Sequence, residues 1–472
     1  MTQRAVVQTE GARVVTYPAP AGTPASEDFE VYVNGTPVFV HVARVSTVPV
    51  NQVWPGYQRP IEQTELASFA AFDFEGQVEV KIVPRTPIED VAVRPLSYPI
   101  AHEVDGQTVT FVIDRPCQLV VEINGWHGAL HLFADPLEKD RPDPDDPKVH
   151  YFGPGVHQAG TIELRSGEHV YLEGGAIVHG TIAAVDKSDI KISGRGILDA
   201  SDIGRSEAPQ MIALLGCQNV EIEGIILRDP HVWTVVPALC RNVHIDNIKL
   251  VGLWRYNSDG IDLVNSQDVL IENCFVRAFD DNIVLKGFDQ WRGRPTGGSA
   301  LRNITVRNCV LWNDWGRALE LGAETRTESI HDVLFENCDI VHWVHRAMDI
   351  QNGDRADVYN VRFEDIRVEE AIVEGEFRED IPGYVSDPDQ VGLLIELIVA
   401  PNDYSKDPQR GRIHGIEFVD VTAVGERWPH SHLLGFDAEH AVEGITFQNL
   451  MIQGRAIFDA EEGRMRLNAY VS

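Results

Sequence analysis

The stretch Asp268-Val-Leu-Ile-Glu-Asn273 is one copy of the short motif that decides the fold of this chain. The motif alternates polar and apolar residues and ends on Asn, Asp or Gly, which is typical of a β-strand that leads into a turn. Most copies lie about 23 to 35 residues apart. Further copies begin at Asp189, Asn219, Asn242, Asn303, Asp332, Asn360, Gly415 and Gly444.

No single copy of this strand can bury its own apolar face. Stacking the copies, at about 4.8 Å per layer, buries a continuous apolar column. A period of two excludes a helical solenoid, and a leucine-rich repeat is excluded because its leucine/asparagine signature is missing. The gap between Val361 and Ile416 is about twice the usual spacing, so we expect one degenerate coil near residues 393–398. The sequence therefore predicts an all-β chain whose main part is a right-handed parallel β-helix.

Two ladders support this register. Asparagine tolerates a left-handed turn and can bond to the turn above it, and one position of the unit is occupied by Asn247, Asn273, Asn308, Asn337 and Asn449. Three of the six cysteines follow directly and should stack inside the column: Cys274, Cys309 and Cys338. None of the six forms a CxxC pair, so we assign both ladders a structural role.

The N-terminal part of the chain is also β-rich but does not repeat. Asn34-Gly35 and Asp105-Gly106 are strong turn signals between short alternating segments, which favours a small β-sandwich. A charged, proline-rich run then covers residues 139–147. We predict an N-terminal β-sandwich-like domain at 1–140, a linker at 141–150 and the β-helix at 151–472.

The charge of the chain narrows the class of partner. Its 472 residues carry a formal net charge of -32, which disfavours nucleic acid and anionic membranes as partners. No apolar stretch approaches the roughly 18–20 residues that a transmembrane helix needs. The first 16 residues contain no apolar signal core, so the chain as written is expected to be cytoplasmic, or secreted if a signal was removed. The oligomeric state stays open.

A second strand of each coil aligns when residues are counted back from the repeat. Two positions before these strands, one column is predicted to run across neighbouring coils: Trp233, Asp259, Asp281, Arg317 and Arg346. Asp280 lies beside this column. Strict alternation would point Asp259 inward, so we expect Gly260 and the preceding turn to bend the chain until Asp259 faces outward.

The carboxylates of this column suggest acid–base chemistry. Three aspartates within two layers repel one another, so one should keep a proton near neutrality. A protonated and an ionised carboxyl side by side are what glycoside hydrolysis requires. Trp233 would offer a flat face to a sugar ring, while Arg317 and Arg346 would hold hydroxyls or a carboxylate. Three acidic side chains project outward from the aligned strands without any bend and are further candidates for substrate binding: Asp262, Glu320 and Asp349.

The segment Asn257-Ser-Asp-Gly-Ile-Asp262, followed about twenty residues later by Asp280-Asp281, resembles glycoside hydrolase family 28, the polygalacturonases. The layout of a β-sandwich before a β-helix is similar to family 49, the dextranases and isopullulanases. The resemblance implies hydrolysis with inversion and without metal or other cofactor. It implies that Asp280 is the general acid, that Asp259 and Asp281 position and deprotonate water, and that Asn257 lies among the substrate-binding residues.

Two departures from the polygalacturonase pattern bear on the substrate. The family's Gly-His-Gly is replaced here by Gly316-Arg317-Ala318, and its Arg-Ile-Lys, which grips the galacturonate carboxylate, aligns with Asp349-Ile350-Gln351. Losing these cations favours a neutral sugar, with an α-glucan such as dextran or isomalto-oligosaccharide preferred. A polygalacturonase-type pectin hydrolase stays an alternative, because Arg317 and Arg346 could bind an acidic group.

Two loops are candidate rims of the substrate cleft. Residues 286–300, which begin at the candidate substrate-binding residue Lys286, interrupt the repeat directly after Asp280-Asp281, and residues 376–390 interrupt it again. The alternatives to hydrolysis on this fold are a polysaccharide lyase, a transglycosylase and a non-catalytic carbohydrate-binding β-helix.

Overall fold

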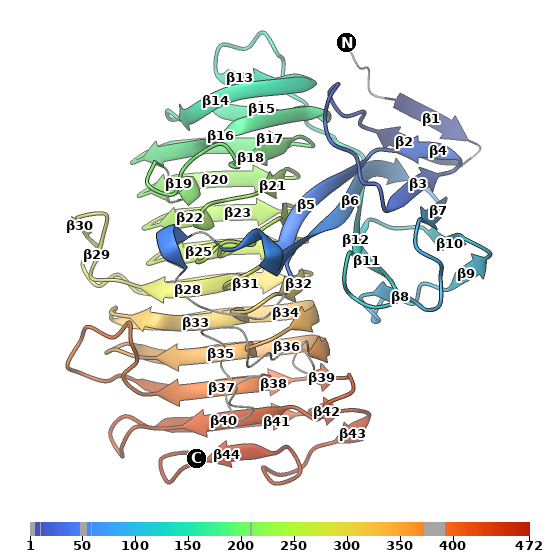
Figure 1. Cartoon of the computed structure of the whole chain (residues 1–472). Helices are drawn as coiled ribbons and strands as arrows, with labels where there is room; N and C mark the ends of the chain where they lie inside the picture. Colours follow the sequence, from blue (N-terminus) through green and yellow to red (C-terminus); the bar gives the residue numbers. More distant parts are fainter. Residues whose placement is uncertain (1–4, 10, 48–53, 58, 208–209, 372–391) are drawn as a thin grey trace.

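A computed structural model describes residues 5–9, 11–47, 54–57, 59–207, 210–371 and 392–472. Figure 1 shows a long stack of parallel strands with a smaller β-domain against its side. No helix in the described ranges is long and apolar enough to span a membrane. The predicted all-β class is confirmed, with a parallel β-helix and a separate N-terminal sheet domain.

The N-terminal domain is a sandwich of two sheets that share one apolar core. One sheet contains β1 (Ala5–Thr9), β2 (Ala12–Thr16), β5 (Val40–Ser46), β6 (Thr64–Glu75), β8 (Val91–Arg94), β11 (Cys117–Ile123) and β12 (Leu130–Pro136). The other contains β3 (Phe29–Val33), β4 (Thr36–Val38), β7 (Val78–Pro84), β9 (His102–Asp105) and β10 (Thr108–Ile113). Both predicted hairpins are confirmed, since β3 pairs with β4 and β9 with β10. Two short 3-10 turns, η1 (Pro55–Tyr57) and η2 (Ile61–Gln63), precede β6.

The β-helix is built from three rows of stacked parallel strands. We call the first the ladder row, because it carries the repeated motif. Its members are β13 (Val149–Phe152), β15 (His169–Leu172), β17 (Ser188–Gly194), β20 (Gln218–Glu223), β23 (Arg241–Asp246), β26 (Gln267–Glu272), β31 (Leu301–Arg307), β34 (Ser329–Trp343), β36 (Asp357–Ala371), β38 (Arg412–Val419) and β41 (Val442–Gln448).

The second row faces the N-terminal domain, and we call it the domain-facing row. It contains β18 (Ile197–Asp199), β21 (Ile226–Arg228), β24 (Lys249–Val251), β27 (Phe275–Ala278), β32 (Val310–Asn313), β39 (Thr422–Ala423), β42 (Met451–Ile452) and the second halves of β34 and β36. Here β14 (Gly155–Glu163) pairs with β16 (Ala176–Val185), which joins the second and third rows, and β43 (Arg455–Ala456) folds back antiparallel onto β42.

The third row carries the predicted acidic residues, and we call it the cleft row. It contains β19 (Gln210–Leu215), β22 (Trp233–Ala238), β25 (Ile261–Val264), β28 (Ile283–Gly287), β33 (Arg317–Thr325), β35 (Arg346–Asn352), β37 (Leu393–Val399), β40 (His430–Leu434) and β44 (Met465–Leu467). The predicted degenerate coil is confirmed, because β37 pairs with both β35 and β40. A small hairpin of β29 (Gln290–Trp291) and β30 (Arg294–Pro295) projects after β28.

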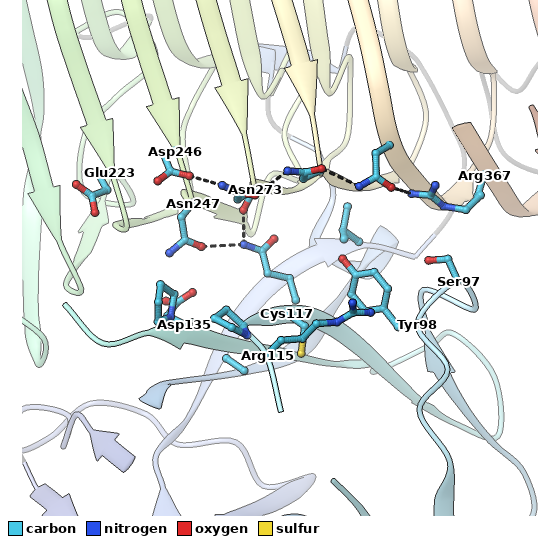
Figure 2. A pocket seen from close by; sticks show the side chains of 17 residues that line it. Ser97, Tyr98, Arg115, Cys117, Asp135, Glu223, Asp246, Asn247, Asn273 and Arg367 are labelled. Carbon is cyan, nitrogen blue, oxygen red and sulfur yellow. Dashed lines mark hydrogen bonds between the residues drawn. The ribbon is translucent and has the colours of Figure 1, made fainter. Parts of the chain in front are cut away.

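The asparagine ladder behaves as predicted. Asn273, Asn308 and Asn337 all have φ between 50° and 57°, the left-handed region that asparagine tolerates. Asn308 Nδ2 donates to Asn273 Oδ1 at 3.2 Å, and Asn337 Nδ2 donates to Asn308 Oδ1 at 2.7 Å. Figure 2 shows this chain of amides along one wall of a groove of about 740 Å³ between the ladder and the N-terminal domain. The stacked cysteines beside it, Cys274, Cys309 and Cys338, are buried and free.

The N-terminal domain packs firmly on the domain-facing row. Lys249 Nζ lies 2.5 Å from Asp135 Oδ2, and Arg94 reaches Glu122 and Glu369 at 2.9 and 2.6 Å. All five side chains are buried at this interface, which also contains a shared apolar cluster. β12 ends at Pro136 and β13 begins at Val149, and the boundaries 1–140, 141–150 and 151–472 stay a prediction.

Candidate active site

The cleft row brings the predicted column together. Ile261 pairs with Ile283, Ile283 with Leu319, and Leu319 with Met348, so the positions two residues earlier also stack. Backbone bonds continue through the turn before the strands, because Gly260 N donates to Asp281 O and Asn282 N donates to the Arg317 carbonyl, both at 2.8 Å. Asp259, Asp281 and Arg317 therefore lie on successive layers.

The turn before each strand directs the aspartates outward, as the sequence analysis assumed. A Cβ at Gly260 would meet Asn282 O at 2.4 Å and Val276 Cγ1 at 2.6 Å, so this position faces the interior and accepts only glycine. The Asn282 side chain also points inward, donating to Val276 O at 2.7 Å and Trp312 O at 2.9 Å. With these neighbours turned inward, Asp259 lies on the outer side.

Lys286 is the shared cation of this outer side. Its Nζ lies 3.1 Å from Asp259 Oδ2 and 3.4 Å from both Asp262 Oδ1 and Asp281 Oδ2. All four side chains are buried. Burial alone would lower the pKa of Lys286, but the surrounding carboxylates hold it well above its usual range. The lysine stays charged and ties three carboxylates into one cluster.

Asp280 and Asp281 are adjacent in sequence but differ in protonation. Burial and the charge of Asp281 raise the pKa of Asp280 to about 7. Burial also opposes ionisation of Asp281, but Lys286 and Arg317 outweigh it and hold the Asp281 pKa below its ordinary value. Asp281 Oδ1 accepts a bond from Arg317 N at 3.2 Å and lies 3.7 Å from Nη1. The pair thus presents a proton donor beside an ionised carboxylate.

Gly316 allows this arrangement to fit. A Cβ at this position would lie 2.5 Å from the carbonyl carbon of Asp280 and 2.8 Å from Asp280 Oδ1. Any side chain here would displace the proposed general acid. The glycine of the aligned Gly316-Arg317-Ala318 segment is therefore explained by close approach to Asp280, one layer below.

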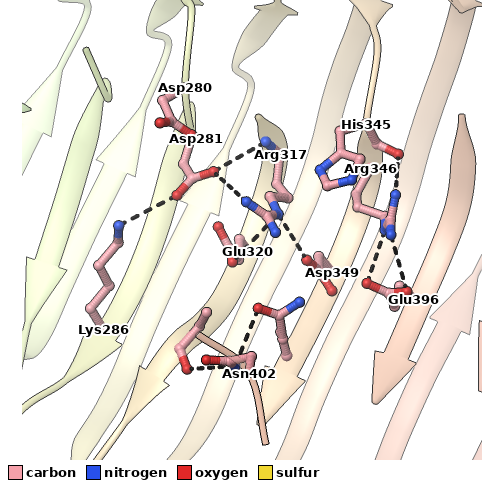
Figure 3. Close-up of polar contacts among 12 residues, drawn as sticks. Asp280, Asp281, Lys286, Arg317, Glu320, His345, Arg346, Asp349, Glu396 and Asn402 are labelled. Atoms are coloured by element: carbon pink, nitrogen blue, oxygen red, sulfur yellow. Dashed lines mark hydrogen bonds and ion pairs between the residues drawn. The ribbon is translucent and has the colours of Figure 1, made fainter. Parts of the chain in front are cut away.

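The outward acidic residues form a second line along the cleft row. Asp262, Glu320 and Asp349 lie at equivalent register positions, and Glu396 on β37 continues the line. Figure 3 shows Glu320 and Asp349 beside Arg317, which reaches toward Asp349, and Glu396 beside Arg346. We call the set of Glu320, Asp349 and Glu396 the acidic row.

Each arginine of the column is engaged by this acidic row. Arg317 Nε lies 3.3 Å from Asp349 Oδ2 and 3.8 Å from Glu320 Oε1. Arg346 donates to Glu396 through Nε at 2.9 Å and Nη2 at 3.3 Å, a bidentate pair. Both predicted arginines are therefore present in the cleft but bind protein carboxylates.

Protons are shared unevenly along the acidic row. Burial, followed by the charge of Asp281, raises the pKa of Glu320 well above its ordinary value. Burial and the charge of Glu396 raise the pKa of Asp349 to about 7. Glu396 is also opposed by burial, yet His432 and Arg346 lower its pKa to about 2. Near neutrality the row contains both hydrogen-bond donors and acceptors.

Two other predicted binding residues make contacts within the protein. The Trp233 ring stacks on Trp291 with centroids 5.4 Å apart, and Lys286 Nζ lies 4.4 Å from its centroid. Asn257 Oδ1 accepts from Arg205 Nη2 at 3.0 Å. Trp233 lies in the column, in register with Asp259, and Asn257 lies in the turn before Asp259. Their contact with substrate stays a prediction.

The sequence analysis missed several residues of this cleft. Glu396 was detectable, because the degenerate coil was predicted and its outward position is acidic. His345 precedes Arg346, stacks on Trp315 at 5.4 Å, and has a pKa far below its usual value because of burial and then Arg346. The charge of Asp280 helps to raise the pKa of Tyr256, which directly precedes the Asn257–Asp262 motif, and that of Tyr404.

Of the two loops predicted to rim the cleft, the structure describes only the first. Residues 286–300 fold into the β29–β30 hairpin, which is held at its base by Asn265 Nδ2 donating to Ser299 O at 2.9 Å. The stacking of Trp291 on Trp233 brings the hairpin against the cleft row. The second predicted rim, 376–390, lies outside the described residues.

A known family model matches the part of the chain that contains most of this site. Residues 178–375 match the family model described as glycosyl hydrolases family 28. This part of the chain is therefore similar to the family 28 glycoside hydrolases. That segment contains Asp259, Asp280 and Asp281, and it includes Lys286 and Arg317.

Related proteins extend the likeness beyond this segment. A dextranase of Arthrobacter globiformis is 23% identical over 413 residues, which cover 64% of this chain and 62% of the relative. A probable polygalacturonase of Vitis vinifera is 28% identical over 134 residues, 27% of this chain and 26% of the relative. The chain therefore spans less than two thirds of each of these relatives.

Solved structures confirm the fold of residues 178–375 and of the N-terminal domain before them. Dex49A from Penicillium minioluteum superposes with a TM-score of 0.65 at 15% identity and 100% coverage of both chains. An exopolygalacturonase from Thermotoga maritima gives a TM-score of 0.50 at 17% identity, covering 64% of this chain and 84% of the other. The predicted resemblance to families 28 and 49 is confirmed.

Proposed function

We propose that this chain is a glycoside hydrolase that cleaves a neutral oligo- or polysaccharide with inversion, and that an α-glucan of the dextran or isomalto-oligosaccharide type is its substrate. The observation that carries the proposal is the contrast between Asp280 and Asp281. A carboxyl with a pKa of about 7 lies beside a carboxylate whose pKa is held low by two cations. The family 28 match and the dextranase relatives support the same reaction class.

In the proposed reaction Asp280 protonates the glycosidic oxygen as the bond to the anomeric carbon breaks. Water attacks that carbon from the opposite face, and Asp281 accepts its proton. Asp259 holds the water, since its carboxyl and that of Asp281 both face Lys286. Proton transfer is balanced, because Asp280 loses one proton and Asp281 gains one. Inversion follows from a single displacement.

The acidic row supports a neutral substrate. A uronate carboxylate would meet Glu320, Asp349 and Glu396, and the two arginines beside them already bind these carboxylates. Sugar hydroxyls can both donate to ionised carboxylates and accept from protonated ones. This line therefore fits hydroxyls better than an additional negative charge.

The same pairing disfavours the lyase alternative. A lyase needs a base that removes a proton next to a uronate, and the cations placed among the aspartates are Lys286 and Arg317. The surrounding carboxylates hold the pKa of Lys286 well above its usual range, so it stays protonated. Burial would lower the pKa of Arg317, but Glu320, Asp281 and Asp349 hold it well above its ordinary value. Arg317 remains protonated and is unsuited to act as the base.

The decisive experiment incubates the wild-type protein and an Asp280→Asn variant with a glycan panel. The panel contains dextran, pullulan, isomalto-oligosaccharides, fructans and oligogalacturonides, with products identified by mass and their anomeric form by NMR. We expect the wild type to release an inverted product from an α-glucan, and Asp280→Asn to lower turnover by at least ~10²-fold. Circular dichroism serves as the control for folding.

Four outcomes would contradict the proposal. Cleavage of oligogalacturonides would show that the acidic row does not exclude uronates. An unsaturated product would favour the lyase. A retained anomer, or an Asp280→Asn variant that keeps full activity, would overturn the assigned acid and base.

A further inference from the structure

A segment of the N-terminal domain reaches the catalytic turn of the β-helix. Residues 54–57 contact Tyr256 and Phe279, which lie in the turns before β25 and after β27, respectively. The Trp54 ring lies 6.0 Å from Phe279, the residue directly before Asp280. The guanidinium of Arg59, fully buried, lies 4.5 Å from the Phe279 ring and 5.0 Å from the Trp54 ring. The N-terminal domain therefore packs against Phe279, the residue that precedes the proposed general acid.

Tyr57 projects from this segment beside the active site. Its ring stacks on Tyr256 with centroids 5.8 Å apart, and the Arg205 guanidinium lies 4.4 Å from it. Arg205 is fixed in turn by bonds to Tyr256 O at 2.7 Å and Asn257 Oδ1 at 3.0 Å. Despite these contacts Tyr57 is 46% exposed. Three parts of the chain thus meet beside the Asn257–Asp262 motif.

The backbone at Tyr57 favours a role in binding. Tyr57 has φ of 58° and follows Gly56 at 65°, so two successive residues are left-handed. This conformation is uncommon for a bulky aromatic residue, and such strain concentrates at functional sites. Nothing in the sandwich core requires it, because the Tyr57 side chain lies at the surface. The conformational cost of the left-handed backbone at Tyr57 is explained if the ring must be presented to a ligand.

The surroundings of Tyr57 have the composition of a sugar site. Burial and then the charge of Asp280 raise the pKa of Tyr256, and the same two causes raise that of Tyr404 to about 12. The charge of Asp280 therefore acts on both phenols. Aromatic faces pack against the C–H faces of sugar rings, while phenol and guanidinium groups bond to hydroxyls.

We propose that Tyr57, with Tyr256 and Arg205, forms a subsite that binds a neutral sugar residue next to the one cleaved at Asp280. The N-terminal domain then takes part in substrate selection, in addition to packing on the β-helix. The inference rests on the proposed hydrolase function, because it places the subsite relative to the scissile bond. It adds a residue from a different domain to the specificity of that reaction.

The test compares Tyr57→Ala and Tyr57→Trp with the wild type, using isomaltopentaose as the probe. Tyr470→Ala is the matched control, because Tyr470 is 40% exposed and lies in the last residues of the chain, after β44. We expect Tyr57→Ala to raise KM by roughly three- to tenfold with little change in kcat, as for the loss of one aromatic contact. Tyr57→Trp should keep KM near the wild-type value, and Tyr470→Ala should change neither constant.

Binding is measured separately by calorimetry in the Asp280→Asn background, where the probe survives. Tyr57→Ala should raise Kd by the same factor as it raises KM. Equal KM and Kd in Tyr57→Ala and wild type would overturn the subsite, as would an effect of the same size in Tyr470→Ala. A wild type that binds isomaltopentaose through Tyr57 but never cleaves it would refute the hydrolase and keep the subsite. A wild type that does not bind the probe would refute both for α-glucans.

Discussion

The two polar faces of the β-helix treat buried charge in opposite ways. Where the domain-facing row meets the N-terminal domain, Arg94 lies between Glu122 and Glu369, and Lys249 faces Asp135, so acids and bases are matched. On the cleft row, carboxylates outnumber cations. Carboxylate oxygens with no hydrogen bond are found on Asp259, Asp262, Glu320 and Asp349, all of them buried.

This difference separates an interface from an active site. Buried polar groups in folded proteins are almost always satisfied, so unpaired ones need an explanation. At the domain interface the pairing holds two domains in one arrangement. In the cleft the excess of carboxylates over cations, together with burial, raises the pKa of several carboxyls and keeps protons available near neutrality.

The largest effect is expected when the paired charges at the domain interface are broken. Arg94→Met leaves Glu122 and Glu369 buried without their shared cation, and we expect the free energy of unfolding to fall by about 3–5 kcal/mol. Arg85→Met is the control, because its pair with Glu30 is exposed and should contribute at most about 1 kcal/mol. Urea denaturation measures both. Equal losses in the two variants would show that burial of the pair is unimportant.

The next effect concerns the cation that the cleft carboxylates share. Lys286→Met should lower kcat by roughly 10²-fold, because Asp259 and Asp281 lose their common partner. Without that charge the pKa of Asp281 rises. The base must be ionised, so the acidic limb of the pH–rate profile should move to higher pH. Lys191→Met, which removes a surface pair with Glu221, is the control. A lower kcat with an unmoved acidic limb would assign Lys286 a purely structural role.

The smallest expected effect is a gain of stability on the cleft side. The Asp349 pKa is raised from 3.8 to about 7, so the folded state holds a proton that the unfolded state loses above pH 4. Stability is therefore lost as pH rises through 4 to 7, and an Asn cannot ionise. Asp349→Asn should raise the free energy of unfolding by about 1–3 kcal/mol at pH 8 and much less at pH 4.

A paired carboxylate provides the matched control for this variant. Asp339 is buried like Asp349, but its oxygens accept from Arg367 at 2.6 and 2.9 Å. Asp339→Asn should destabilise the protein at pH 8. If both variants shift thermal unfolding in the same direction at pH 8, the contrast between satisfied and unsatisfied carboxylates does not control stability.

The catalytic core could be predicted because its signals are local. Asp259 and Asp280-Asp281 lie in motifs of a few residues, and the repeat supplied the register that stacks them. Counting two positions back from each strand also placed Arg317 beside Asp281. What could not be predicted was how Arg317 and Arg346 are paired, because their partners on neighbouring coils depend on side-chain direction. Glu396 could have been predicted, because it lies in the predicted degenerate coil at the position that pairs with Asp349.

The sequence by itself determined the β-helix, the left-handed asparagine turns and the order of the catalytic aspartates. These follow from a period of two and from the conformational preferences of single residues, which act over a few positions of the chain. Only the tertiary structure decided that Tyr57 meets Tyr256, that Lys286 serves three carboxylates and that Arg94 joins Glu122 to Glu369. Such contacts link residues far apart in sequence or on different coils. They are set by how whole sheets pack, and no local pattern records them.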